Sequence, residues 1–214
     1  MKQFNIPFYA TFFSILMLST SCNFENSNYE INIENYTETD YFELISGLKK
    51  DMDSILLESK PQGFSLEVYK RMILLGDMHL SSIQKKRILI SSEKLSRYGK
   101  FLLKKSKIDI DINDKSNQLA FGGLFKPTDN INSKIINQKN DQITLKMNPW
   151  IECALFAIGA DAIWALGSSS ASAWTAAAMT KAFTAVAKRF LGPIGVAIAV
   201  VSFGVCLAEQ SDNL

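Results

Sequence analysis

Apolar side chains recur at every third or fourth position between Thr39 and Lys107, a spacing that is typical of amphipathic α-helices. The first helix is predicted to begin at a capping box formed by Thr37 and Asp40 and to stop at Pro61-Gln62-Gly63. Its expected buried stripe consists of Tyr41, Phe42, Leu44, Ile45, Leu48, Met52, Ile55 and Leu56.

Two further helices are expected before Lys107. One begins near Ser65 and is broken near Gly76-Asp77, and the other runs from about Leu80 to Lys107. Their predicted apolar stripes are Leu66, Tyr69, Ile73 and Leu74 in the first, and Ile83, Ile88, Leu95, Tyr98, Leu102 and Leu103 in the second. The Lys and Arg residues of the longer helix are interpreted as a solvated face and not as a binding patch.

Residues 108–149 lack this periodicity and are predicted to form an irregular linker. The run from Asp109 to Asp114 alternates charge with Ile and fits either a short strand or a loop. Gly122-Gly123, Pro127 and many Asn residues favour exposed, irregular backbone.

The first 22 residues have the order of a secretory signal: a basic Lys2, an apolar run from Ile6 to Leu18, and small residues before Cys22. The apolar run is too short for a stable span of a bilayer about 30 Å thick. Cys22 after small residues resembles a lipobox, whose Cys is acylated, although Ser19 stands where lipoproteins usually carry Leu. The alternative is ordinary cleavage, which leaves Cys22 incidental. Residues 23–38 are polar and fit a flexible tether.

After Pro149 the composition changes to an Ala-rich, apolar segment, residues 150–214, which we call the C-terminal segment. A turn is predicted at Gly192-Pro193, and the following Ile194–Ala208 stretch is about 22 Å long as a helix, which is short for a span. Its large aromatic residues fit either a core or a membrane interface. Four of them are Trp164, Trp174, Phe183 and Phe190, and Phe156 also belongs to the predicted membrane-active segment.

Charges are unevenly placed along the C-terminal segment. Lys181, Lys188 and Arg189 precede the predicted turn, whereas Glu152 and Glu209 lie near the outer ends. A helical hairpin would therefore have a positive tip and a negative base. The inside-negative potential of a target cell favours inward movement of a cation by about 2.3 kcal/mol per charge per 100 mV. We therefore expect the tip to insert first.

These patterns predict an all-α chain: a signal, a small helical region, a linker, and a hydrophobic C-terminal helical hairpin or three-helix segment. The formal net charge of +2 gives no strong basic field for nucleic acid. Three Cys and a single His, His79, do not supply a zinc site or a catalytic set, so neither a metal, a cofactor nor an enzymatic activity is expected.

Two stretches resemble the sporulation-delaying protein family, the precursors of bacterial cannibalism toxins. Cys153-Ala-Leu-Phe-Ala and the run from Thr175 to Lys188 are similar to its toxin segment, and the run from Thr39 to Leu48 is similar to its early acidic-Tyr-Phe helix. The resemblance implies that residues 39–107 are a pro-region, and that proteolysis after export releases a bacteriocin-like antimicrobial peptide. It also implies three kinds of partner: the target-cell membrane, processing proteases or maturation proteins, and a cognate membrane immunity protein.

The chain departs from that family at one cysteine. The family's toxin has a second Cys six residues after the first, where this chain has Gly159, so Cys206 is the candidate partner of Cys153. In an up-down-up arrangement of three helices these two residues would lie at opposite ends, and a disulfide therefore requires a different packing. A competing interpretation is a surface lipoprotein whose membrane-associated helical tail serves assembly or interaction.

Overall fold

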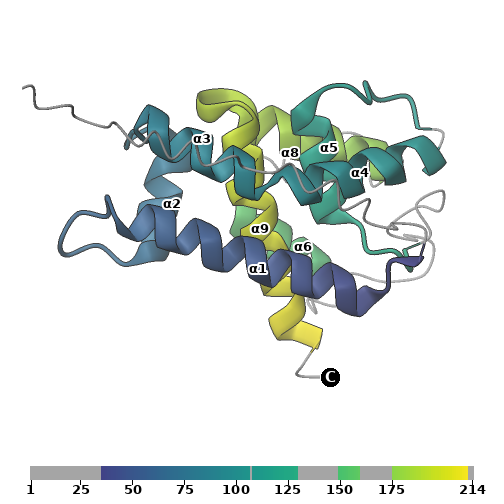
Figure 1. The fold of residues 1–214 in the computed structure, drawn as a ribbon, viewed down its shortest axis with the longest axis horizontal. Helices are drawn as coiled ribbons and strands as arrows, with labels where there is room; N and C mark the ends of the chain where they lie inside the picture. Colours follow the sequence, from purple (N-terminus) through teal and green to yellow (C-terminus); the bar gives the residue numbers. More distant parts are fainter. Residues whose placement is uncertain (1–34, 107, 130–148, 160–174, 212–214) are drawn as a thin grey trace, which may run out of the picture. The chain divides into compact units, whose positions relative to one another are not determined.

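The computed structural model describes residues 35–106, 108–129, 149–159 and 175–211. The part of the chain that it describes is helical and contains no strand, which confirms the all-α prediction (Figure 1). The helices are α1 (Glu38–Leu57), α2 (Leu66–Leu75), α3 (Ser82–Ser91), α4 (Glu93–Ser106), α5 (Lys115–Leu124), α6 (Pro149–Ile158), α8 (Ala176–Leu191) and α9 (Pro193–Ser211).

Local sequence signals set most helix boundaries. The Thr37 hydroxyl accepts from the Asp40 amide, and the Asp40 carboxylate accepts from the Thr37 amide at 2.7 Å, so the predicted capping box starts α1. Gly76 ends α2 with a φ of 84°, a left-handed conformation that Gly adopts without steric cost. The predicted stripe of α1 faces the core, with Ile45, Met52 and Leu56 almost fully buried.

The predicted helix from Leu80 to Lys107 is divided at Ser92 into α3 and α4, and Ser81 caps the start of α3 with Gln84. Most of its predicted stripe is buried, but the prediction for Ile83 is wrong, because this residue is 70% exposed. Its position on α3 turns it away from Ile88, which is fully buried.

The prediction of an irregular linker over residues 108–149 is wrong at α5. Asp114 accepts a hydrogen bond from the Ser116 amide at 2.7 Å and caps this helix, which is buried from Gln118 to Leu124. The preceding run from Asp109 is a loop with bends and no strand. Residues 130–148 of the predicted linker lie outside the described residues.

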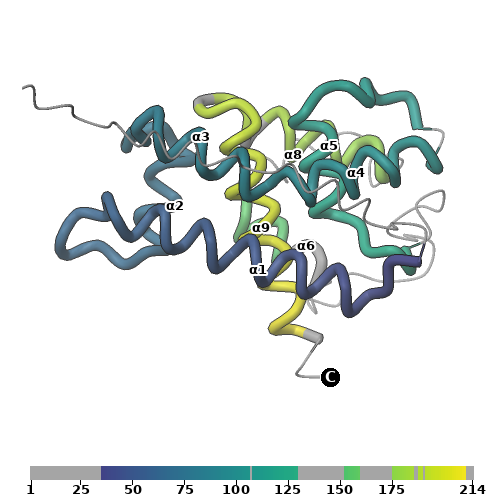
Figure 2. The backbone as a smooth tube through the Cα atoms, viewed as in Figure 1, coloured from purple at the N-terminus to yellow at the C-terminus, as the bar shows by residue number. Residues whose placement is uncertain are grey.

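One core joins α1 to α6, α8 and α9, because residues 32–214 form a single compact unit. The predicted pro-region and C-terminal segment are therefore not separate bodies. α9 contacts α1, α2, α3, α5, α6 and α8. Figure 2 shows α9 crossing α1, with its last turns extending beyond α1 in this view.

Candidate membrane-active segment

α9 combines the composition of a membrane span with a buried position. Pro193–Gln210 is an 18-residue stretch of mean hydropathy 1.7, and the one helix in the described part of the chain long and apolar enough to cross a membrane. At 1.5 Å per residue it is about 27 Å long, close to the thickness of a hydrocarbon core. The whole helix α9 begins at Pro193 and ends at Ser211, so it is longer than the predicted Ile194–Ala208 stretch. Ile194 to Val201 are buried in the protein, as the core helix of a soluble protein would also be.

Two helices upstream of the C-terminal segment, α1 and α5, make close contacts with α9. On α5, a Cβ placed on Gly123 would lie 2.3 Å from the Val200 Cβ, so the glycine lets the two helices touch. On α1, the Ile45 side chain packs against Gly204, where an added Cβ would lie 2.9 Å from Ile45 Cγ2. The α5 backbone at Gly123 thus lies against the Val200 side chain, and the Ile45 side chain of α1 lies against the α9 backbone at Gly204.

α5 is in turn held against α4. A Cβ on Gly99 would lie 1.8 Å from the Gln118 carbonyl oxygen, and one on Gly122 would lie 2.5 Å from the Leu95 carbonyl oxygen. The Tyr41 hydroxyl donates to the Gly123 carbonyl at 2.6 Å. Burial, together with the charge of Asp129, raises the pKa of Tyr41 well above its ordinary value, so this hydroxyl stays a neutral donor. Gly122-Gly123 therefore marks close packing, not loose backbone.

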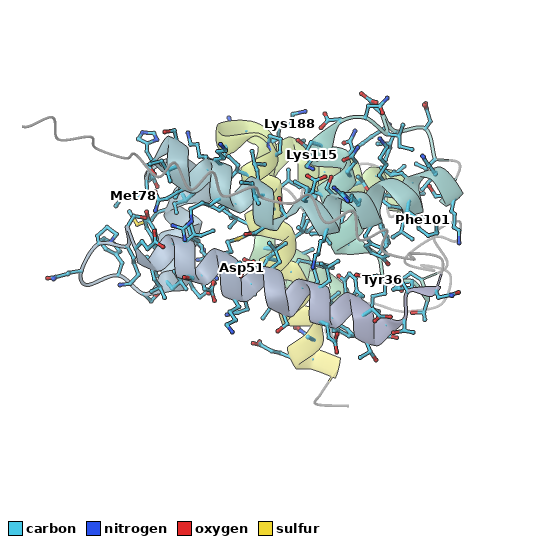
Figure 3. All side chains as sticks on the ribbon, viewed as in Figure 1. Tyr36, Asp51, Met78, Phe101, Lys115 and Lys188 are labelled. Atoms are coloured by element: carbon cyan, nitrogen blue, oxygen red, sulfur yellow. A yellow bond between two sulfur atoms is a disulfide. The ribbon has the colours of Figure 1, made fainter. Side chains whose placement is uncertain are left out.

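The predicted positive tip is docked on the start of α5. α8 ends at Leu191, Gly192 has a φ of 58°, and Pro193 begins α9, which confirms the turn. The Lys188 ammonium lies 2.6 Å from the Asp114 carboxylate, the residue that caps α5. Burial raises the pKa of Asp114, but the hydrogen bonds from Lys188 and the Ser116 amide outweigh it and hold the pKa below its usual range. Figure 3 labels Lys188 and Lys115, the residue that follows Asp114 in the chain.

A disulfide joins Cys153 and Cys206, whose Cα atoms are 5.4 Å apart. Cys153 lies in the first half of α6 and Cys206 near the end of α9, and Gln210 donates to Glu152 at 3.1 Å. α6 and α9 are therefore antiparallel, and the expected up-down-up arrangement, with Cys153 and Cys206 at opposite ends, is wrong. The disulfide and Glu152 lie at the end of α9 opposite the Gly192 turn.

The remaining predicted site residues have different environments. Phe183 is buried and stacks edge-on against Phe203, with ring centroids 5.5 Å apart, so it is a core residue. Lys181, Lys188 and Arg189 are exposed along α8. Cys22, Trp164 and Trp174 lie outside the described residues.

Phe156 on α6 is 50% exposed and borders a groove of about 430 Å³ between α2, α6 and α9. Val68 and Leu75 of α2 line the same groove and are also exposed. The C-terminal segment is therefore not completely covered. Its α6 leaves an apolar edge in contact with solvent.

A buried ion pair joins α1 to α2 next to this groove. The Lys70 ammonium lies 2.7 Å from Asp53 and 2.8 Å from Glu67, and Lys70 is 4% exposed. Burial raises the pKa of Asp53, but the hydrogen bond from Lys49 and the ion pair with Lys70 outweigh it and lower the pKa. These charges pair with one another, and among the described residues no three His, Cys, Asp or Glu side chains are grouped to hold a metal.

Sequence reasoning missed Gly123, Gly99 and Asp114. Asp114 precedes a Lys-Ser-Asn-Gln run and has the residue type of an N-cap, a signal that was present. The two glycines are recognisable only once α4, α5 and α9 are placed against one another.

In the part of the chain that the structure describes, the fold and site define a helical protein whose span-length apolar helix, α9, packs against six other helices. No family model, no curated protein and no solved structure matches the chain.

Proposed function

We propose that the chain is the exported precursor of a bacteriocin-like toxin, and that proteolysis releases a C-terminal peptide that disrupts the membranes of competing or sibling bacterial cells. The observation that carries the proposal is the position of α9. This helix has the length and hydropathy of a span, yet α1 and α5 lie on it. The pro-region would thus keep the toxin soluble until release.

The contacts that α1 and α5 make with the C-terminal segment support the proposal that the toxin is inactive before release. Ile45 and Gly123 occupy the faces of α9 that lipid would otherwise contact, and Asp114 neutralises Lys188 at the tip. In a bilayer, backbone groups within a helix remain bonded, so α9 needs no refolding to change from a protein to a lipid environment. A cut between α5 and α6 that removes α1 and α5 would expose the apolar surface and separate Lys188 from Asp114 in the same event.

The disulfide defines the product of release. Cys153 and Cys206 link α6 to α9, so a cut upstream of Pro149 frees α6, α8 and α9 as one covalent unit. A cut between α6 and α8 leaves two chains that stay linked. The released toxin would therefore be a disulfide-linked helical unit, with the disulfide at one end of α9 and the basic residues Lys188 and Arg189 near the opposite end.

We infer that export precedes this processing and that the signal at residues 1–22 directs it, with Cys22 as the site of lipidation if the lipobox is used. Release then requires a processing protease or maturation protein, and the producing cell requires a membrane immunity protein. Target membranes are the partner on which the peptide acts.

A second candidate function is a surface lipoprotein with a helical tail that serves assembly or interaction. It is favoured by the single compact unit, because α9 is part of the same core as α1 and α5. Such a protein stays full length at the cell surface.

Mass spectrometry of culture supernatant separates the two functions. The toxin proposal predicts a C-terminal fragment that contains the Cys153–Cys206 disulfide. Recovery of only the full-length chain in the cell envelope, from cells in which the protein is expressed, contradicts it and supports the lipoprotein function.

A further inference from the structure

α3 and α4 carry an unusual excess of positive charge. Residues 82–106 contain eight Lys and Arg residues and one acidic residue, Glu93, whereas the whole chain has 23 basic and 21 acidic residues. The rest of the chain is therefore net acidic, and the basic charge is concentrated on these two helices.

Ser92 joins the two helices. The Ser92 amide donates to the Ile88 carbonyl at 3.0 Å at the end of α3, and the Ser96 amide donates to the Ser92 carbonyl at 3.0 Å at the start of α4. Within each helix, residues three or four apart lie on one side. The exposed residues at this spacing on the two helices, which we call the α3–α4 face, are Ile83, Lys86, Ile90, Lys94, Arg97 and Lys104.

The α3–α4 face is not needed to build the core. The opposite side supplies Ile88, Leu95 and Leu102, which are buried. Yet Ile83 and Ile90 stand on the outward side with 70% and 52% of their surface exposed. A single exposed apolar residue is ordinary, but two placed one above the other between cationic side chains form an amphipathic surface with a basic rim.

On α4 the outward basic residues have long side chains, and their charges are only partly neutralised. Arg97 lies 3.4 Å from Glu93, while Lys94 and Lys104 extend into solvent. The Lys105 ammonium lies 4.4 Å from the centre of the Phe101 ring, so an aromatic side chain adjoins the same surface. Figure 3 labels Phe101 on α4.

We propose that the α3–α4 face docks on a bilayer that contains anionic phospholipid. The basic side chains meet the headgroups, and Ile83 and Ile90 enter the boundary between headgroups and acyl chains. Charge complementarity and the two exposed isoleucines favour a lipid surface, because a purely ionic ligand gains nothing from them. This inference does not depend on the proposed toxin function, since α9 remains covered during docking.

Binding to vesicles tests the proposal. The chain from Asn32 to Leu214, which forms one compact unit without the apolar signal, is mixed with vesicles of phosphatidylcholine alone or with one-third phosphatidylglycerol. We expect binding only to the anionic vesicles, weakening as salt rises. Lys94→Gln/Lys104→Gln is expected to weaken binding about tenfold or more, because each cation near such a surface contributes about fivefold.

Two further variants make the result specific. Ile83→Ser/Ile90→Ser is expected to weaken binding several-fold with its salt dependence retained. Lys50→Gln/Arg71→Gln removes the same charge from exposed positions on α1 and α2 and is expected to bind more nearly like the parent. Circular dichroism melting verifies that each variant is folded.

Three outcomes overturn the proposal. Equal binding to neutral vesicles assigns the interaction to apolar surface elsewhere in the chain. Equal losses in the Lys94/Lys104 and Lys50/Arg71 variants show that total charge, and not this face, matters. Unchanged binding of Ile83→Ser/Ile90→Ser together with full competition by soluble polyphosphate assigns the face to a soluble polyanion.

Discussion

Gly123 of α5 lies directly on Val200 of α9, with no room for a methyl group between the two helices. This contact ties a helix upstream of the C-terminal segment to the helix that has the composition of a membrane span. Gly123→Ala is expected to destabilise the compact unit by about 1–3 kcal/mol, because the new Cβ meets Val200 in a packed core. Thermal unfolding by circular dichroism measures the change.

Gly47 provides the matched control. It lies within α1, and nothing lies within 4 Å of a Cβ placed there. Gly47→Ala is expected to stabilise the protein by about 0.5–1 kcal/mol, because Ala restricts the unfolded chain and favours helix. Equal effects of the two substitutions would show that Gly123 has no special packing role.

The Asp114–Lys188 pair is expected to stabilise the docked tip in a pH-dependent manner. Because the pKa of Asp114 is lowered in the folded protein, its contribution is present above the unfolded pKa and is lost as pH falls through the folded value. Asp114→Asn, which keeps a capping side chain, is expected to cost about 0.2–1 kcal/mol near pH 7.

Two comparisons check this assignment by thermal unfolding. The difference between parent and Asp114→Asn should shrink as the pH falls below about 4, where the parent carboxylate becomes protonated. Asp114→Ala should cost about 1 kcal/mol more than Asp114→Asn, because it also removes the cap of α5. A difference that grows in acid contradicts the pairing.

Opening the Cys153–Cys206 disulfide is expected to lower stability considerably. The two cysteines are 53 residues apart, and the loop-entropy model gives about 4 kcal/mol for a loop of that length. Peptide mapping without reductant should recover the Cys153–Cys206 pair, and Cys153→Ser/Cys206→Ser should unfold at lower temperature. A free thiol at both positions in the exported protein contradicts the assignment.

Reversing the tip charges is expected to weaken the released peptide. Lys188→Glu/Arg189→Glu opposes inward movement under an inside-negative potential, which acts on each charge with about 2.3 kcal/mol per 100 mV. Growth inhibition by the peptide measures potency, and Lys188→Arg/Arg189→Lys retains the charge as a control. Unchanged killing by the reversed peptide removes the proposal that the tip inserts first.

Local signals along the chain predicted much of the fold. The Thr37–Asp40 capping box, the break at Gly76 and the turn at Gly192-Pro193 were all anticipated, because each depends on a few neighbouring residues. The stripe of α1 was also predicted, since Ile45 and Met52 repeat at helical spacing in a helix with one buried side.

Features that depend on tertiary packing were not predicted. α5 is buried on several sides and carries Gly122 and Gly123, so it lacks the one-sided periodicity that identifies a surface helix. Ile83 fits a helical stripe but lies on the outward side of α3. The distance between Cys153 and Cys206 depends on the antiparallel arrangement of α6 and α9, which spacing along the chain does not specify.

We propose that the C-terminal segment acts on membranes once α1 and α5 no longer cover it. A protease site inserted between residues 130 and 148 of the Asn32–Leu214 chain allows cleavage in the presence of polarised anionic vesicles, with a potential-sensitive dye as the readout. The uncut chain, and an otherwise identical chain without the site, should leave the potential intact, and cleavage should dissipate it. The C-terminal fragment is also separated after complete cleavage and added alone to the vesicles at the same concentration. A potential that persists in the presence of this fragment contradicts the proposed membrane activity.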